Sequence, residues 1–375
     1  MDFSRREFVK LAGAAGAFGV AAGCAGFRYD KPRGLRYAVS ILGDTHFDAE
    51  PESVYHSHYD ESNKWAKVQH EEFQRNGEMW RSRCRELLAA SAKLANKRRD
   101  TAFVLQMGDI IQGDCDDVPT HQKMLDDCIK MLRAPYPEGL PFLTVMGNHD
   151  IRGKGARDAY FQFAEAFLAK ELGKPVRYPA LSFRKGGDLW VFCDFEERDL
   201  KPVIETIEAD PTARHTFLVT HGPFTTADGG GSWRWRLGGH RECEKDRIRL
   251  YELLSRRRAV VLSGHTHTVA CYRHENEFGG FSEFTANSVW SKPELATAEP
   301  LASGVGEYGK LNAQRLTGDK LADFTAEADF FRKGLKDYFM NNGAGHFRLN
   351  VADSGVTVEF YPGAALEPAR AFKLK

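Results

Sequence analysis

Apolar residues along this chain gather in short runs that alternate with amphipathic stretches. Mostly apolar runs of three to eight residues are typical of buried strands, and they cover 35–42, 102–107, 141–146, 216–219 and 260–262. Apolar positions three and four residues apart are typical of helices, and they cover 80–96, 121–132, 157–172 and 321–340. Residues 48–76 are polar and aromatic, with no clear period.

Two pairs of strand-like segments are joined by turn residues. Segments 180–183 and 189–195 flank Gly186-Gly187-Asp188, and segments 346–351 and 356–361 flank Asp353-Ser354-Gly355. Each pair predicts a hairpin. Strands that alternate with helices and end in hairpins predict an α/β fold with helices outside the sheets.

Composition narrows the class of protein. The chain has 375 residues, 42% apolar and 28% charged, which is ordinary for a globular protein with one large domain. The 52 basic residues balance the 52 acidic ones. We therefore expect no nucleic-acid-binding surface, since such a surface needs an excess of positive charge. The seven cysteines are scattered and indicate neither a disulfide framework nor a zinc finger.

The first 25 residues are typical of an export signal. Arg5-Arg6 precede a weakly apolar, Ala- and Gly-rich run over 11–25, which is too short and too diluted to span a membrane. The arginine pair resembles a twin-arginine signal, and Ala21-Ala22-Gly23-Cys24 resembles a lipobox. Simple cleavage after Ala25 is the alternative to lipidation at Cys24. We expect export by the twin-arginine translocation machinery to the periplasm or cell envelope, with membrane contact only through a lipid anchor.

Five short polar motifs follow the apolar strands. They are Asp44-Thr45-His46, Gly108-Asp109, Gly147-Asn148-His149-Asp150, His221 and Gly264-His265-Thr266-His267. Ligands of open α/β sheets bind at the carboxyl ends of strands. Residues two apart on an extended segment point the same way, so both members of each Asp-His or His-His pair can reach one site. Mixed oxygen and imidazole donors suit Mn, Fe or Zn better than Ca.

This ordered series resembles the calcineurin-like metallophosphoesterase superfamily over about residues 36–290. The resemblance implies two packed mixed β-sheets flanked by helices, an αββα sandwich. It also implies two divalent or trivalent metal ions held by Asp44, His46, Asp109 and His267 at the first position, and by Asp109, Asn148, His221 and His265 at the second. We expect the domain to cover 35–375, with a C-terminal insertion at about 291–344.

The same resemblance implies a catalytic pair and shows one departure. His149 would protonate the leaving oxygen or stabilise the transition state, and Asp150 would orient its ring; a helix N-cap is the alternative role for Asp150. The family often has Asp where this chain has Gln112. This change affects the groups that orient Asp109 and its neighbours, and Gln112 can substitute as an amide donor and acceptor.

The predicted function is hydrolysis of phosphate esters by water that two metal ions activate. Diesters are slightly favoured, because the complete ligand set around a Gly-His-X-His pair is similar to diesterase branches of the family. The alternatives are a phosphomonoesterase or pyrophosphohydrolase of the same fold, or a non-catalytic metal-binding protein.

Four residues outside the metal motifs are predicted to contact the substrate. Trp233, Arg234 and Arg236 lie in a glycine-rich stretch soon after His221, and Arg152 follows His149 closely. Tryptophan can stack on a flat group and arginine can pair with phosphate. An ordinary surface loop is the alternative for 228–240. His56, His58 and His70 are interpreted as surface or rim histidines.

Overall fold

The computed structural model describes residues 34–48, 54–56, 64–80, 84–177, 180–194, 199–226, 236–289 and 297–375. The predicted export signal, including Cys24, lies outside the described residues. Within the described part, none of the helices is both long and apolar enough to cross a bilayer.

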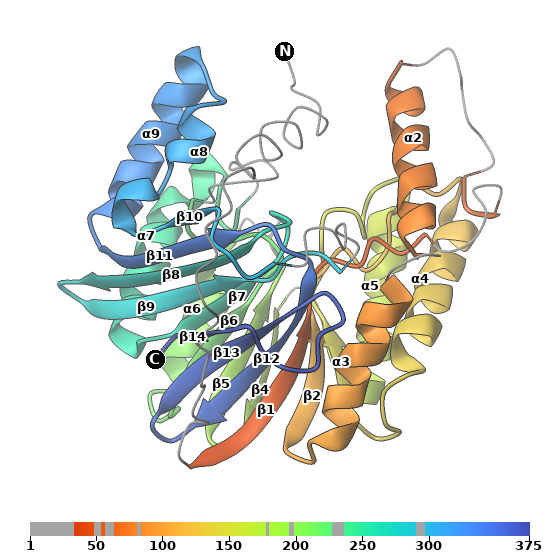
Figure 1. Ribbon diagram of the computed structural model, residues 1–375, viewed down its shortest axis with the longest axis horizontal. Coiled ribbons are helices and arrows are strands. Elements are labelled where there is room, and N and C mark those ends of the chain that lie inside the picture. The colour runs from red at the N-terminus through yellow and green to blue at the C-terminus, as the bar shows by residue number, and fades with distance from the viewer. Residues whose placement is uncertain are drawn as a thin grey trace, which may run out of the picture. The chain divides into compact units, whose positions relative to one another are not determined.

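The described strands form two sheets (Figure 1). The six-stranded sheet has, in spatial order, β14 (Arg370–Lys373), β13 (Gly355–Pro362), β12 (Gly345–Ala352), β1 (Leu35–Leu42), β2 (Thr101–Gln106) and β3 (Phe142–Thr144). The eight-stranded sheet has β10 (Ala302–Ser303), β11 (Leu335–Asn341), β8 (Val269–Asn276), β9 (Gly279–Thr285), β7 (Val260–Ser263), β6 (Thr216–Val219), β5 (Asp188–Cys193) and β4 (Ala180–Lys185).

The described helices are α2 (Lys64–Met79), α3 (Arg85–Lys97), α4 (Val118–Arg133), α5 (Ala156–Leu172), α6 (Lys201–Ala209), α7 (Glu244–Arg257), α8 (Lys310–Ala313) and α9 (Gly318–Arg332), with short 3₁₀ turns η3 (Arg241–Cys243) and η5 (Val305–Glu307). Local sequence explains several ends. The Asp117 carboxylate accepts a hydrogen bond from Thr120 N at 2.8 Å and so caps α4. Helix α5 ends at Gly173, whose φ of 64° suits the left-handed conformation that closes a helix.

Alternate residues along a strand pack into different hydrophobic clusters of the core. Val39 and Ile41 pack between the sheets in one cluster with Trp190 and Phe217, whose rings stack at 4.1 Å. Leu42 faces the other way, into a second cluster with α3, α4 and α5. A third cluster joins the eight-stranded sheet to α6, α7 and α9. The predicted fold, two packed mixed sheets flanked by helices, is confirmed. The strands read as continuous apolar runs because both of their faces are buried.

Strand direction brings several strand ends to one edge. Strands β1, β2 and β3 are mutually parallel, and so are β5, β6 and β7. Strand β12 pairs antiparallel with β1, so the C-terminal hairpin of β12 and β13 completes the first sheet. The loops that carry the polar motifs therefore leave their strands at the carboxyl edge of each sheet.

The predicted helix over 321–340 is wrong in its second half. Helix α9 ends at Arg332, and strand β11 begins at Leu335 and pairs with β8. Tyr338 and Met340 face the α9 side of the sheet, whereas Phe339 faces the core between the sheets. A strand that is apolar on both faces has no alternation, and its spacing can be mistaken for the end of a helix.

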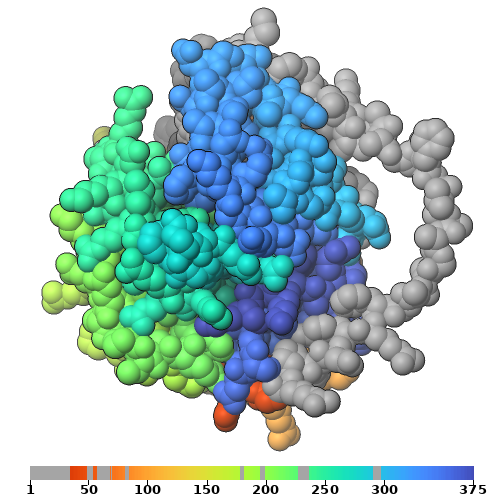
Figure 2. Space-filling model, turned by 90° about the vertical axis from the view of Figure 1, so that its left-hand side faces the viewer, coloured from red at the N-terminus to blue at the C-terminus, as the bar shows by residue number. Residues whose placement is uncertain are grey.

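Two further differences concern helices and a hairpin. Helix α2 occupies part of the stretch that has no clear period, and the helix predicted from residue 80 begins only at Arg85. The β8–β9 hairpin is absent from the predicted strands. In the described part of the C-terminal segment, β11 extends the eight-stranded sheet, and α9 packs beside α7 through Tyr251 and Phe330. Figure 2 shows this segment in light blue beside the green and teal surface of the neighbouring region.

Candidate metal centre

The predicted metal ligands follow strands of both sheets. In chain order they are Asp44 and His46 after β1, Asp109 after β2, Asn148 after β3, His221 after β6, and His265 and His267 after β7. Hydrogen bonds tie the two sets together: His265 N donates to the Asp44 carboxylate at 3.1 Å, and His221 Nδ1 lies 2.7 Å from Met107 O. The structure thus brings residues from five strand ends and both sheets to one place.

Asp44, His46 and His267 form the first group. His267 Nε2 lies 3.1 Å from Asp44 Oδ2 and 3.0 Å from His46 Nε2, and the distance from His46 Nε2 to Asp44 Oδ2 is 3.9 Å. Asp44 and His46 are buried, whereas the His267 side chain is 17% exposed. Three donor atoms therefore converge on one point that is reached from the side of His267.

Asp109, Asn148, His221 and His265 form the second group. His221 Nε2 lies 3.1 Å from Asp109 Oδ2, 3.2 Å from Asn148 Oδ1 and 3.3 Å from His265 Nδ1. One imidazole nitrogen thus faces a carboxylate oxygen, an amide oxygen and a second imidazole nitrogen. All four are groups that bind transition metals.

Asp109 stands between the two groups. Its Oδ2 lies 3.6 Å from His46 Nε2 and 3.1 Å from His221 Nε2. The ligand atoms of Asp44, His46 and His267, those of Asp109, His221 and His265, and those of His46, Asp109 and His149 each lie within 4.8 Å of one another. The set with His149 shares His46 with the first group and Asp109 with the second, so the Asp109 carboxylate lies where it could bridge two adjacent ions.

Hydrogen bonds on the far side of two imidazoles favour one tautomer of each. Nδ1 of His221 faces the Met107 carbonyl, which can only accept, so in the neutral ring Nδ1 carries the proton and Nε2 presents its lone pair to the centre. His46 Nδ1 lies 2.9 Å from Gln112 Oε1, with the same consequence for its Nε2. Such outer partners are the usual means of orienting a metal-binding histidine.

Backbone conformation at the centre is unusual. His46, Asp109, His265 and His267 have φ of 40°, 50°, 66° and 52°. Residues other than glycine rarely adopt this left-handed backbone conformation, and each one that does destabilises the fold by on the order of 1–3 kcal/mol. Four of the seven predicted ligands carry this strain, which is typical of functional sites.

The motif glycines provide space. A Cβ at Gly147 would lie 2.1 Å from Asp109 N, and one at Gly264 would lie 2.4 Å from Asp44 Oδ1. Gly108 additionally has a φ of 84°, and a Cβ there would meet His221 Nδ1 at 2.7 Å. Loops from different strands can therefore approach each other only because these positions lack side chains.

Electrostatics favour the ionised carboxylate at Asp109. Burial alone would raise its pKa, but the charges of His221 and His149 outweigh burial and hold the pKa well below the usual value. Burial opposes charge on His221 too, yet Asp109 and Asp44 raise its pKa to about 10. Burial and the neighbouring His221 lower the pKa of His265 well below the usual value. Asp109 and His265 are therefore already in the form that binds a cation, whereas a cation at the second group would displace the Nε2 proton of His221.

These donors fit a pair of transition-metal ions. The set combines two carboxylates, one amide oxygen and four imidazoles, a mixture that suits Mn, Fe or Zn. Asp109 lies where a bridging ligand is needed, and His46 and His221 have their Nε2 atoms directed inward. The sequence motifs and the geometry therefore indicate the same kind of site, a dinuclear centre.

His149 lies next to the shared carboxylate. Its backbone N donates to Asp109 Oδ1 at 2.6 Å, and its ring stands edge-on to that of His46, with centroids 4.3 Å apart. Its Nδ1 is 3.0 Å from Gln112 O, and Arg152 Nη1 is 2.9 Å from both ring nitrogens. Burial lowers the pKa of His149 to about 4; Asp109 opposes this shift and Arg152 adds to it.

The predicted role of Asp150 differs from its contacts. Its Oδ1 accepts from Ile111 N at 3.2 Å and its Oδ2 from Gly147 N at 2.8 Å. The carboxylate therefore ties the Asp109 loop to the Asn148 loop, and the His149 ring is held by Gln112 and Arg152 instead. Helix α5 begins only at Ala156, with Gly155 at its N-cap, so Asp150 is not a helix cap either.

The predicted substrate contacts have different outcomes. Trp233 and Arg234 lie outside the described residues. Arg236 is 7% exposed, and its Nη2 lies 2.9 Å from Glu327 of α9, so its guanidinium is buried in an ion pair. Arg152 pairs with Asp114 and lies against His149, with 28% of its side chain exposed, so it borders the centre. Of the two that the structure describes, Arg152 therefore borders the metal centre, and Arg236 is paired with α9.

Sequence reasoning missed several residues around the first group. Asn76 Nδ2 donates to Gln112 Oε1 at 2.6 Å, and Trp80 Nε1 donates to Thr45 O at 2.8 Å and His46 O at 3.0 Å. Asn76 belongs to α2, and Trp80 directly follows the end of this helix.

The interpretation of His56 as a surface or rim residue is wrong: its side chain is buried, with the residue 7% exposed, and it stacks on Phe73 at 3.7 Å. His70 is partly buried, and His58 lies outside the described residues.

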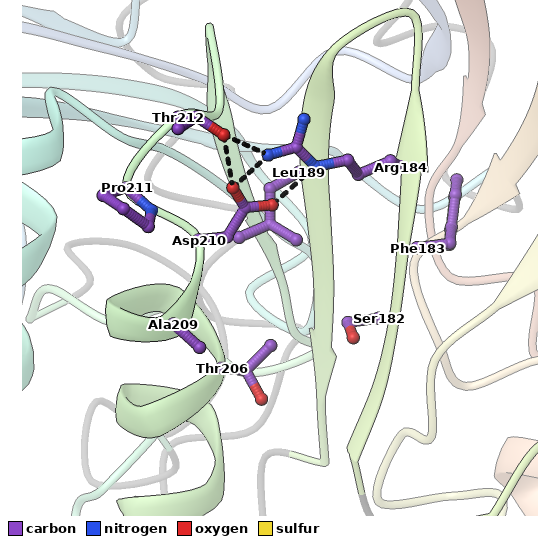
Figure 3. A pocket seen from close by; sticks show the side chains of 9 residues that line it. All are labelled: Ser182, Phe183, Arg184, Leu189, Thr206, Ala209, Asp210, Pro211 and Thr212. Atoms are coloured by element: carbon purple, nitrogen blue, oxygen red, sulfur yellow. Dashed lines mark hydrogen bonds and ion pairs between the residues drawn. The ribbon is translucent and has the colours of Figure 1, made fainter.

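An open hollow elsewhere on the molecule contains none of the predicted site residues (Figure 3). It lies between the β4–β5 hairpin and the end of α6, and Arg184 crosses it to bind Asp210 and Thr212. An ion pair within the hollow satisfies its charged groups, so we assign it no function.

Comparisons with known proteins support the same centre. The model of a family described as calcineurin-like phosphoesterase matches residues 38–269, a span that contains every predicted metal ligand. No curated protein matches the chain.

Several solved structures are similar in fold. A dimetal phosphatase from Danio rerio is 11% identical, with 91% of this chain and 99% of that chain covered and a TM-score of 0.50. GAP50, the anchor in the inner membrane complex of Plasmodium, is 15% identical (91% and 89% covered, TM-score 0.46). The purple acid phosphatase PPD1 from yellow lupin is 10% identical (90% and 53% covered, TM-score 0.48).

Proposed function

Because the chain belongs to the calcineurin-like phosphoesterase family, we propose that it is a phosphodiesterase that uses a dinuclear Mn, Fe or Zn centre. The observation that carries this proposal is the position of Asp109, whose carboxylate faces a ligand histidine of each group. Family membership supports a metal-dependent phosphoester hydrolase. The preference for diesters rests on the similarity of the Gly-His-X-His pair to diesterase branches.

The predicted ligands fall into two sets, one for each ion. Asp44, His46 and His267 would hold one ion, Asn148, His221 and His265 the other, and Asp109 would bridge them. When bound, two such ions supply a nucleophile at neutral pH and neutralise charge on the phosphoryl oxygens.

We propose that His149 serves the leaving group. It lies beside Asp109 at the partly exposed side of the centre, within reach of a substrate held there. The guanidinium of Arg152 disfavours a second positive charge on the ring. An anionic phosphate bound beside the pair offsets that charge, so His149 can then hold a proton for the departing oxygen.

The test is a paired assay on the purified chain. Bound metal would be counted, and turnover of bis-p-nitrophenyl phosphate and p-nitrophenyl phosphate would be measured with added Mn²⁺. We expect about two bound ions per chain, because a dinuclear centre holds two metals. The diester should be hydrolysed faster than the monoester, and Asp109→Asn should lose both activities. A protein that binds no metal refutes the centre, whereas a preference for the monoester refutes only the substrate class.

We also propose that residues 1–25 direct export through the twin-arginine translocation machinery, with lipidation at Cys24. The support is the Arg5-Arg6 pair and the motif that ends at Cys24. Changing both arginines to lysine should leave full-length precursor in the cytoplasmic fraction. Changing Cys24 to alanine should release the mature protein from the membrane fraction, and unchanged fractionation in either variant counts against the corresponding part.

A further inference from the structure

Helix α2 contacts the metal centre although it carries none of the predicted ligands. Asn76 and Gln112 are both fully buried, and Asn76 Nδ2 donates to the same Gln112 Oε1 that faces His46 Nδ1. Three side chains thus form a chain of hydrogen bonds from α2 to the first ligand group. Trp80 binds the backbone oxygens of Thr45 and His46 and holds the helix end against the same loop.

The direction of these hydrogen bonds decides what His46 can do. When the Gln112 oxygen faces His46, the proton must lie on Nδ1, and Nε2 presents a lone pair to Asp44 and His267. When the Gln112 amide is turned by 180°, its NH₂ group faces Nδ1, the proton moves to Nε2, and His46 can no longer bind a cation there. A carboxylate at position 112 would have no such ambiguity, because both of its oxygens accept.

We infer that Asn76 is a positioning residue for the metal centre: by donating to Gln112 Oε1, it holds the amide in the orientation that makes His46 Nε2 a ligand. The inference rests on the proposed dinuclear function. It assigns to α2, which lies between the first two metal motifs in sequence, a part in positioning a metal ligand.

Three variants test whether the polarity of the residue 76 side chain or its packing matters for metal binding. Asn76→Asp keeps the shape but can only accept when ionised, so the Gln112 NH₂ group turns towards it and towards His46. Asn76→Leu keeps most of the volume and leaves the amide without a preferred orientation. Gln112→Glu, combined with Asn76→Leu, restores an acceptor to His46 without any help from α2.

Affinity for Mn²⁺ would be measured on the full-length chain by competition with a chromophoric chelator, at mildly alkaline pH where a carboxyl at position 76 is ionised. Loss of an outer hydrogen-bond partner commonly costs 10–100-fold in metal affinity. We expect about a 100-fold loss in Asn76→Asp, about a 10-fold loss in Asn76→Leu, and recovery in the double variant. The unfolding midpoint of each metal-free variant would show that the fold is kept.

The alternative results are distinct. Unchanged affinity in Asn76→Asp, or equal losses in the Asp and Leu variants, overturns the inference, because packing or nothing at all would then explain the contact. Failure of the double variant to recover overturns it as well. Absence of Mn²⁺ binding by the unmodified chain would instead refute the proposed function on which the inference depends.

Discussion

Replacing Gly147 with alanine should displace the carboxylate that both ligand groups share. A Cβ at this position would lie 2.1 Å from Asp109 N and 2.2 Å from Asp109 Oδ1. Ordinary van der Waals contact begins at 3.4 Å, so the atoms must separate by about 1.3 Å. Asp109 is 1% exposed and hydrogen-bonded to His149 N, so it cannot swing away freely.

The magnitude follows from this displacement. Overpacking a closely packed site costs about 1–3 kcal/mol of stability, which a domain of this size can tolerate. Function is more sensitive, because misplacing a reacting group by about 1 Å can cost on the order of 100-fold in rate. We therefore expect Gly147→Ala to fold, to bind metal more weakly, and to lose about 100-fold or more in kcat/KM.

The measurement needs a matched control. A Cβ at Gly306 meets nothing within 4 Å, so Gly306→Ala should retain activity and metal content. Both variants would be compared with the unmodified chain by metal analysis, by kinetics on bis-p-nitrophenyl phosphate with Mn²⁺, and by denaturant unfolding. Wild-type kinetics and metal content in Gly147→Ala would refute the reasoning, since Asp109 would then not depend on the space that this glycine leaves.

Three other outcomes are expected. Burial lowers the pKa of His274 to about 3, so the unfolded chain takes up a proton below about pH 6.5 while the folded chain stays neutral, and stability falls as the pH falls. His274→Phe keeps the stack on Phe281 and removes this titratable group. Between about pH 7 and about pH 4, its free energy of unfolding should therefore fall by about 3 kcal/mol less than that of the unmodified chain, as measured by urea unfolding. Glu283 is buried and accepts from Phe224 N, Thr225 N and the Thr225 hydroxyl; Glu283→Gln turns a donor towards donors and should cost about 1–3 kcal/mol in chemical denaturation. Chelation should abolish hydrolysis and lower the Tm, because an ion at 100 times its Kd adds about 2.7 kcal/mol; added Mn²⁺ should restore both, and a Tm indifferent to the chelator would count against metal in the folded state.

The predicted ligands come together in the structure because the constraints on them are local. Each ligand follows directly after a buried apolar run, and the strand directions then bring the five loops to neighbouring edges. Asp44 and His46, like His265 and His267, reach the centre in pairs, as their two-residue spacing predicts. Three of these four residues have left-handed and not extended backbone, which the spacing does not predict. The α/β architecture follows from the same runs, since strands buried on both faces must be covered by helices.

Prediction fails where burial or distance removes the local signal. Residues of β11 are apolar on both faces, so their spacing resembles the end of α9. The hydrogen bond of Asp150 to Ile111 also has no sequence signature, because the two residues lie 39 positions apart. Residue type predicts that Arg236 contacts the substrate, yet its ion-pair partner Glu327 belongs to a helix more than 90 residues further along.

The Gln112 position shows how one departure from a family pattern is compensated at a distance. An acceptor is still needed for His46 Nδ1, and an amide supplies one only if something fixes its orientation. The sequence marks the departure at residue 112 but gives no indication of the residue that supports it, because Asn76 lies 36 positions earlier in a stretch without apolar period. A substitution of carboxylate by amide removes one negative charge and adds a requirement for orientation. The centre therefore depends on α2 in a way that a carboxylate at position 112 would not require, and metal affinity in the Asn76 variants measures that dependence directly.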